Sequence, residues 1–168
     1  MSEAKPVAEV SEEGAVVREG YQELRSEGYG YEGPDGLHLS PLEAVYLVYK
    51  GRLIATMDGQ EMSFRDLMAY YSRRDEMMWV MFTVYYDLRK RGRKPVQGPS
   101  RNSLVFKDPR GGLVEVYVLE ESRMISLTDV LEMLEASVRN GRIPVLAIVD
   151  RHGDVTYYAI NRFTPRRG

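Results

Sequence analysis

The chain has 168 residues, a formal net charge of −2, two histidines and no cysteine. With 43% hydrophobic and 29% charged residues it is typical of a folded globular protein with one large domain or two small ones. Lack of cysteine excludes disulfides, thiolate nucleophiles and cysteine-bound zinc. No apolar run reaches the roughly 18 residues that cross a bilayer, and the acidic N-terminus lacks a signal-peptide core, so we expect a cytoplasmic protein with no membrane partner.

The first 78 residues predict a small α+β domain. Apolar alternation over residues 8–17 around a Glu-Glu-Gly turn predicts a hairpin at a sheet edge. A short helix is expected over residues 20–27, and the Gly/Pro-rich segment 28–36 is predicted to be a loop.

Two helices follow in this part of the chain. Ser40, Pro41 and Glu43 have the pattern of an N-cap, a first helical proline and a capping box, which predicts a helix from residue 39 to residue 51. A short strand over residues 52–56 and an Asp-Gly turn separate it from a second helix capped by Ser63.

The helix expected over residues 75–91 begins as an apolar face and ends in dense positive charge. Met81, Val84, Tyr85 and Leu88 recur at helical spacing and are expected to be buried. The basic last turn before Gly92 suits the negative end of the helix dipole.

The rest of the chain predicts strands at residues 103–108, 113–121, 143–150 and 155–163, with a helix over residues 127–141. The apolar face of that helix is expected to be buried, and the continuous apolar strand 143–150 is expected to be covered on both faces. We therefore expect an α/β (α+β) protein with domains at residues 1–78 and 79–168, the second containing a mixed sheet flanked by helices.

The residues themselves leave several chemistries open. Asp108 and Glu115 could contribute to a magnesium nuclease site, with Arg142 as a cation that stabilises phosphate. The segment 28–36, with its interleaved tyrosines, and the basic tail 162–167 could instead form an RNA-binding module. Neither histidine has an obvious set of catalytic partners.

Two segments carry a resemblance to a known family. YYDLRKRG at residues 85–92 and SVRNGRIPVLAIVDRHGDVTYYAINR at residues 137–162 resemble the archaeal tRNA-splicing endonucleases. LSPLEAVYLVYKGRL and SFRDLMAYYS resemble that family's N-terminal helices, so the resemblance covers residues 20–165. It implies a nuclease-like C-terminal domain.

The family's catalytic tyrosine, histidine and lysine are all missing from the matching positions. Phe106, or Lys107 with one gap, replaces the tyrosine, and Gly111 or Gly112 replaces the histidine. Arg142 is the cation nearest to the lysine position. The resemblance therefore implies a non-catalytic structural subunit of the crenarchaeal heterotetrameric type, with no cofactor and no metal.

The resemblance also implies partners. In the family an acidic turn, here residues 150–154, inserts into a basic cleft on an opposing subunit, so Asp150 and Asp154 are expected to bind a catalytic endonuclease subunit in a two-plus-two complex. Residues 155–160 resemble the strand that packs two subunits tail to tail in the family, which implies that Val155 and Tyr157 also bind a partner. Arg162 and Arg166 are the candidates for contact with precursor tRNA. A divergent nuclease active by itself and a non-enzymatic RNA-binding module are the alternatives.

Overall fold

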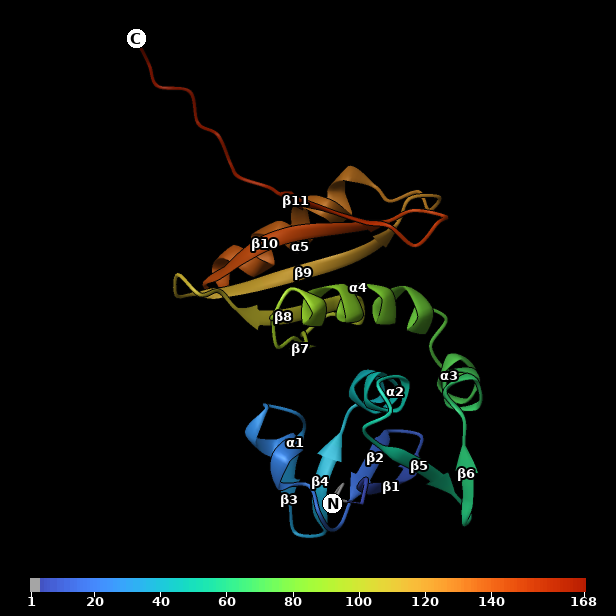
Figure 1. Ribbon diagram of the computed structural model, residues 1–168. Coiled ribbons are helices and arrows are strands. Elements are labelled where there is room, and N and C mark those ends of the chain that lie inside the picture. Colours follow the sequence, from blue (N-terminus) through green and yellow to red (C-terminus); the bar gives the residue numbers. More distant parts are fainter. Residues whose placement is uncertain (1–3) are drawn as a thin grey trace. The chain divides into compact units, whose positions relative to one another are not determined.

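The computed structural model of the protein describes residues 4–168 and divides into two compact units, Met1–Phe82 and Thr83–Gly168. Each unit contains one mixed β-sheet with helices packed on it (Figure 1). This confirms the α+β fold class. The division falls inside the helix that starts near residue 78 rather than ahead of it. Among the described residues, no helix is both long and apolar enough to span a bilayer.

The N-terminal unit is built on a six-stranded sheet with the strand order β3-β4-β2-β1-β5-β6. Its strands are β1 (Val7–Ser11), β2 (Gly14–Val17), β3 (Tyr31–Gly33), β4 (Gly36–Leu39), β5 (Ile54–Met57) and β6 (Gln60–Met62). Only the β1–β5 pair is parallel. Three helices belong to this unit: α1 (Gln22–Ser26), α2 (Pro41–Tyr49) and α3 (Phe64–Ser72).

The capping patterns act as the sequence predicts. The Ser40 hydroxyl accepts a hydrogen bond from the Glu43 N–H at 3.2 Å, and the Glu43 carboxylate accepts one from the Ser40 N–H at 3.0 Å. Ser63 and Asp66 make the same reciprocal pair at the start of α3. Each exchange satisfies two backbone donors that the first helical turn leaves open.

Two expectations for this unit are wrong. The hairpin at residues 8–17 is at the centre of the sheet, because β1 also pairs with β5 and β2 with β4. The segment predicted to be a loop, residues 28–36, contains β3, which pairs with β4 across a tight turn.

The C-terminal unit has a five-stranded sheet with the order β11-β10-β9-β8-β7. Its strands are β7 (Val96–Gln97), β8 (Ser103–Lys107), β9 (Leu113–Glu120), β10 (Arg142–Val149) and β11 (Val155–Ala159). β9 and β10 are parallel and all other pairs are antiparallel, so the sheet is mixed as expected. β11 is an edge strand that ends at Ala159 rather than at residue 163.

Helices α4 (Met78–Lys90) and α5 (Leu127–Arg139) contact opposite faces of this sheet (Figure 1). The Tyr117 hydroxyl on one face donates to the Met133 carbonyl oxygen of α5 at 2.9 Å. The Tyr157 hydroxyl on the other face donates to Asp87 of α4 at 2.6 Å. The predicted apolar face of α4 is confirmed, because Met81, Val84, Tyr85 and Leu88 are all at most 3% exposed.

The expectation for α5 is wrong. Of the described α5 side chains only Ser137 is buried, whereas Leu127, Leu131 and Val138 are 73%, 49% and 64% exposed. The amphipathic pattern is present, but among residues 4–168 the apolar side of α5 is only partly covered, with Val130 and Leu134 half-buried and Leu131 and Val138 exposed. The strand β10 has buried residues on both faces, Pro144 on one and Ala147 and Val149 on the other, and of its residues only Ile143 at the start is exposed.

Candidate functional site

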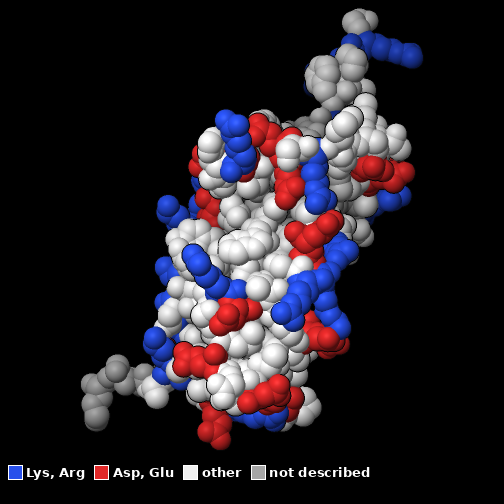
Figure 2. All heavy atoms as spheres, turned by 90° about the vertical axis from the view of Figure 1, so that its right-hand side faces the viewer, with Lys and Arg blue, Asp and Glu red and all other residues white. Residues whose placement is uncertain are grey.

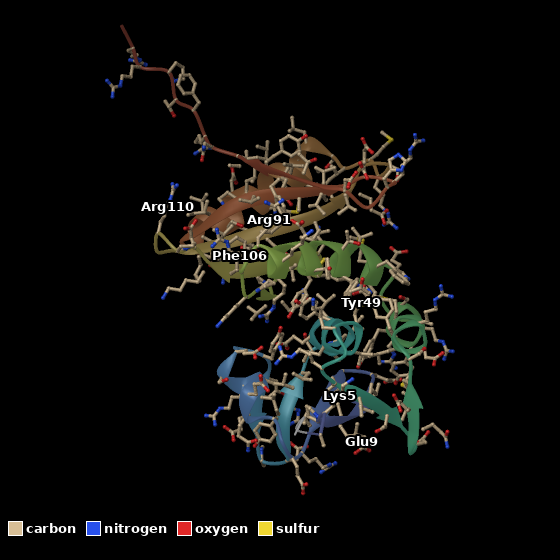
Figure 3. All side chains as sticks on the ribbon, in the orientation of Figure 1. Lys5, Glu9, Tyr49, Arg91, Phe106 and Arg110 are labelled. Atoms are coloured by element: carbon tan, nitrogen blue, oxygen red, sulfur yellow. The ribbon has the colours of Figure 1, made fainter. Side chains whose placement is uncertain are left out.

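The three family positions that the resemblance assigns to catalysis lie at one end of the C-terminal sheet. Phe106 is near the end of β8, Gly111 is in the β8–β9 turn, and Arg142 opens β10. Residue pairing places Lys107, Leu113 and Arg142 side by side on three adjacent strands. Figure 3 shows Phe106 and Arg110 at this end of the unit. We call it the β8–β9 end of the sheet.

Phe106 and Gly111 bring no reactive group to this end. The half-buried Phe106 ring lies under the Arg93 guanidinium, with 5.7 Å between the guanidinium carbon and the ring centroid, a cation–π contact. Gly111 and Gly112 have φ values of 91° and 90°, a region that favours glycine. A histidine at Gly111 would have open space around its Cβ but a strained backbone.

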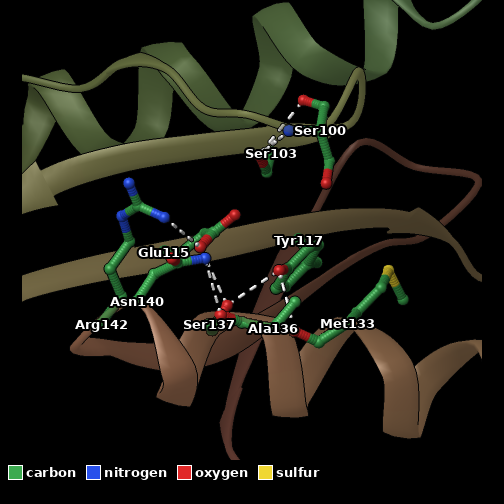
Figure 4. A network of polar contacts seen from close by, with 9 residues as sticks. All are labelled: Ser100, Ser103, Glu115, Tyr117, Met133, Ala136, Ser137, Asn140 and Arg142. Carbon is green, nitrogen blue, oxygen red and sulfur yellow. Dashed lines mark hydrogen bonds and ion pairs between the residues drawn. The ribbon is translucent and has the colours of Figure 1, made fainter.

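Arg142 belongs to a buried polar network between β9, β10 and α5 (Figure 4). Its guanidinium lies 3.4 Å from Glu115 Oε2, which also accepts a hydrogen bond from the Ser137 hydroxyl at 2.9 Å. Ser137 Oγ is in turn 2.8 Å from the Tyr117 hydroxyl. Burial raises the pKa of Tyr117, which keeps this phenol neutral.

Glu115 is badly placed to act as a base on a substrate. It is 1% exposed, and one carboxylate oxygen is occupied by Ser137 and Arg142. Asp108, the other candidate acid, accepts a hydrogen bond from the Arg110 N–H and so stabilises its own turn. Across residues 4–168, no group of three or more metal-ligating side chains converges.

The two histidines lie elsewhere. His38 is in the N-terminal unit, where Nε2 lies 2.5 Å from Asp35 Oδ1 and the ring stacks on Tyr31. His152 follows the far end of β10, about 25 Å along the strand from Arg142 at the usual rise per residue. Neither histidine belongs to the group formed by Phe106, Gly111 and Arg142.

The residues predicted to bind a partner are at that far end of the sheet. Asp150 Oδ1 accepts hydrogen bonds from the N–H groups of His152 and Asp154 at 2.8 and 3.0 Å. The bond from the Asp154 N–H is the main cause of a lowered pKa for Asp150. Asp150 therefore shapes the turn, whereas Asp154 is exposed.

The last strand presents different residues to its two faces. Val155 and Tyr157 are on the α4 side and only partly exposed, and Tyr157 is bound to Asp87. Tyr158, on the α5 side, is 53% exposed. Beside it runs an apolar groove of about 430 Å³ whose lining includes Leu131, Leu134, Val138, Pro144 and Ile160.

The two arginines predicted to contact RNA follow β11. Arg162 is 3.9 Å from Glu135 of α5, and both side chains are largely exposed. Arg166 is exposed in the extended tail that leaves the sheet (Figure 1). Because β11 runs antiparallel to β10 and Ala159 pairs with Val145, the chain after β11 returns beside the start of β10. Arg162 therefore lies near the β8–β9 end, where it lines the groove together with Arg139.

Sequence reasoning missed Ser137 and Tyr117 of the buried network. A serine among apolar positions of an amphipathic helix was the available signal, but the network depends on the pairing of β9 with β10.

Comparisons with known proteins place both parts of the chain in one family. Residues 8–68 match the N-terminal domain of tRNA intron endonucleases, and residues 78–157 match the catalytic C-terminal domain of the same family. A tRNA-splicing endonuclease of Pyrococcus horikoshii is 34% identical over 142 residues, covering 83% of this chain and 84% of the relative. One of Methanosarcina mazei is 31% identical over 157 residues, covering 89% of this chain but only 44% of that longer protein. The chain belongs to the tRNA intron endonuclease family.

Proposed function

We propose that this chain is a non-catalytic structural subunit that assembles with a catalytic chain of the same family and activates it for intron removal from precursor tRNA. The observation that carries the proposal is the β8–β9 end of the sheet. Phe106, Gly111 and Arg142 occupy the positions where the resemblance implies a tyrosine, a histidine and a lysine.

The chemical groups at these positions support a non-catalytic role. Metal-free cleavage of a phosphodiester needs a base, an acid and a cation near the phosphate. Phenylalanine and glycine supply neither proton acceptor nor donor, and Glu115 is buried against Ser137 and Arg142. Arg142 can stabilise negative charge, but it stays protonated and so cannot also act as the base.

The exposed apolar side of α5 supports assembly with a partner of the same fold. Leu127, Leu131 and Val138 are exposed, and Leu131 and Val138 also line the groove beside β11. β11 is an edge strand, so one side of its backbone is unpaired within the sheet. An exposed patch of this kind marks an interaction surface, and an open edge can pair with a similar strand. Asp154 at the adjacent turn offers a charge for a basic surface on the partner. We expect two such chains and two catalytic chains in the complex.

A cleavage assay tests the proposal. An intron-containing precursor-tRNA transcript is incubated with this chain, with a catalytic chain of the family, and with both. We expect cleavage only in the mixture, together with a complex larger than either chain on size-exclusion chromatography. Leu131→Glu, which places a charge in the groove, should prevent both.

Cleavage by this chain alone would refute the proposal and direct attention to Asp108, Glu115 and Arg142. Glu61→Lys, a charge change on an exposed position of β6 in the N-terminal unit, is the control and should leave assembly intact.

A further inference from the structure

The β8–β9 end of the sheet has no reactive pair, but it gathers positive charge from four separate segments. Arg93 and Lys94 follow α4, Lys107 ends β8, Arg110 is at the tip of the β8–β9 turn, and Arg139 is in the last turn of α5. Pairing of Lys107 with Leu113, and of Leu113 with Arg142, places these strand ends within about 10 Å at the usual strand spacing. We call Lys94, Lys107, Arg110 and Arg139 the cationic set.

The charge of this set is not cancelled locally. Within residues 4–168, none of the four side chains has a carboxylate at ion-pair distance, and all four are exposed. Three acids lie close to the set in the sequence, and Glu135, one turn before Arg139 in α5, is 3.9 Å from Arg162. Asp108 binds the backbone of its own turn, and the buried Glu115 faces Arg142.

The local field is therefore opposite in sign to the whole chain, whose net charge is −2. The face of the molecule drawn in Figure 2 has acidic and basic side chains interspersed. A cluster of one sign on an otherwise acidic protein attracts anions by a local field rather than by global charge. Such clusters are typical of surfaces that contact phosphate groups.

The uncharged residues among the cations suit a polynucleotide. Leu113 and Ile143 are 44% and 46% exposed. The Phe106 ring makes a cation–π contact with Arg93. The turn at Gly111 and Gly112 leaves open space where a side chain would otherwise project. This end of the sheet therefore combines exposed positive charge with exposed apolar side chains.

We propose that this cationic end binds the phosphodiester backbone of RNA without cleaving it. The inference deepens the proposed function and rests on it for the identity of the RNA. It assigns RNA contact to the cationic set rather than to the tail arginines Arg162 and Arg166. Because the contacts are to phosphates, binding should depend strongly on salt and little on sequence.

The test compares the full-length chain with the variant Lys94→Ala/Lys107→Ala/Arg110→Ala. Binding of a labelled precursor-tRNA transcript is measured by fluorescence anisotropy at about 50 mM and about 200 mM salt. Each lost phosphate contact lowers the salt slope by about one. If three phosphate contacts are lost, the ratio of the wild-type binding constant to that of the variant should fall by about 20- to 40-fold when salt is raised from about 50 mM to about 200 mM.

Two further variants control for charge and folding. Lys50→Ala/Arg65→Ala/Arg73→Ala removes three exposed cations from the N-terminal unit and so makes the same change in net charge. It should retain the wild-type salt slope. A charge-preserving variant, in which Lys94 and Lys107 become arginine and Arg110 becomes lysine, should restore binding.

Three results would overturn the inference: a wild-type chain that does not bind the transcript at low salt, equal losses in the alanine variant and the control, or lost assembly with unchanged RNA binding. The last would assign the surface to an acidic protein partner. Running the bound RNA on a denaturing gel separates this inference from the proposed function. Cleaved RNA would refute the non-catalytic assignment. A loss of binding in the alanine variant of the cationic set, but not in the control variant, would still support RNA binding by that set.

Discussion

Removal of one hydroxyl group should loosen the edge of the C-terminal sheet. Tyr157 on β11 donates to Asp87 of α4 at 2.6 Å, and Arg91 holds the same carboxylate at 2.8 Å while lying over the Tyr157 ring. Tyr157→Phe keeps the ring and its contact with Arg91 and deletes only the hydrogen bond. The variant therefore measures what that bond contributes to the attachment of β11.

The expected cost is about 1.5 kcal/mol. Hydrogen bonds to charged groups contribute about 1.5–3 kcal/mol, and the lower value applies because Asp87 keeps its ion pair with Arg91 and remains partly exposed. With a urea m-value of about 2 kcal/mol/M, the midpoint of unfolding should fall by about 0.7 M. Burial and the Asp87 carboxylate raise the pKa of Tyr157, so the bond persists below about pH 10, the usual tyrosine pKa, and is lost only as pH rises through the raised value.

Urea unfolding followed by circular dichroism measures this change. Tyr158→Phe is the matched control, because Tyr158 is the next residue, is 53% exposed and faces the other side of the sheet. It should change stability by less than about 0.5 kcal/mol. Equal midpoints for the two variants would refute the reasoning. A double-mutant cycle with Asp87→Ala should give a coupling energy of about 1 kcal/mol.

Three other perturbations test separate features. Glu115→Ala should destabilise the chain by about 3 kcal/mol, because it leaves Arg142 without its buried partner, and in urea titrations the loss should be smaller when Arg142 is also replaced by alanine. Ser40→Ala should lower stability by about 1 kcal/mol by removing the bond to the Glu43 N–H, which thermal unfolding would detect. The lowered pKa of Asp150 means that its bonds stabilise the turn above about pH 4 and are lost as pH falls further. Amide exchange in the turn should show this loss in the wild type but not in Asp150→Asn.

Local chemistry explains what could be predicted from the sequence. Ser40 and Ser63 mark helix starts because a short polar side chain can satisfy the open N–H groups of the first turn wherever the helix lies. The buried side of α4 follows from spacing alone. These signals need no knowledge of distant parts of the chain.

Features that depend on residues far apart in the chain do not follow from local sequence pattern. The alternation in residues 8–17 is the same for an edge hairpin and a central one, and the two are distinguished only by the pairing of β1 with β5 and of β2 with β4. The Glu115–Arg142 pair joins residues 27 positions apart through the register of β9 and β10. The pattern of α5 predicts an apolar face but does not identify what covers it.

The exposed apolar side of α5 has a consequence for the abundance of the protein. A chain that displays Leu127, Leu131 and Val138 to water has a surface that favours self-association, and the open edge of β11 adds a second route to aggregation. If a partner covers this surface, chains made in excess of that partner would be recognised by chaperones and proteases. Yield on recombinant expression would then rise when both chains are produced together, and the two would be expected to accumulate in matched amounts.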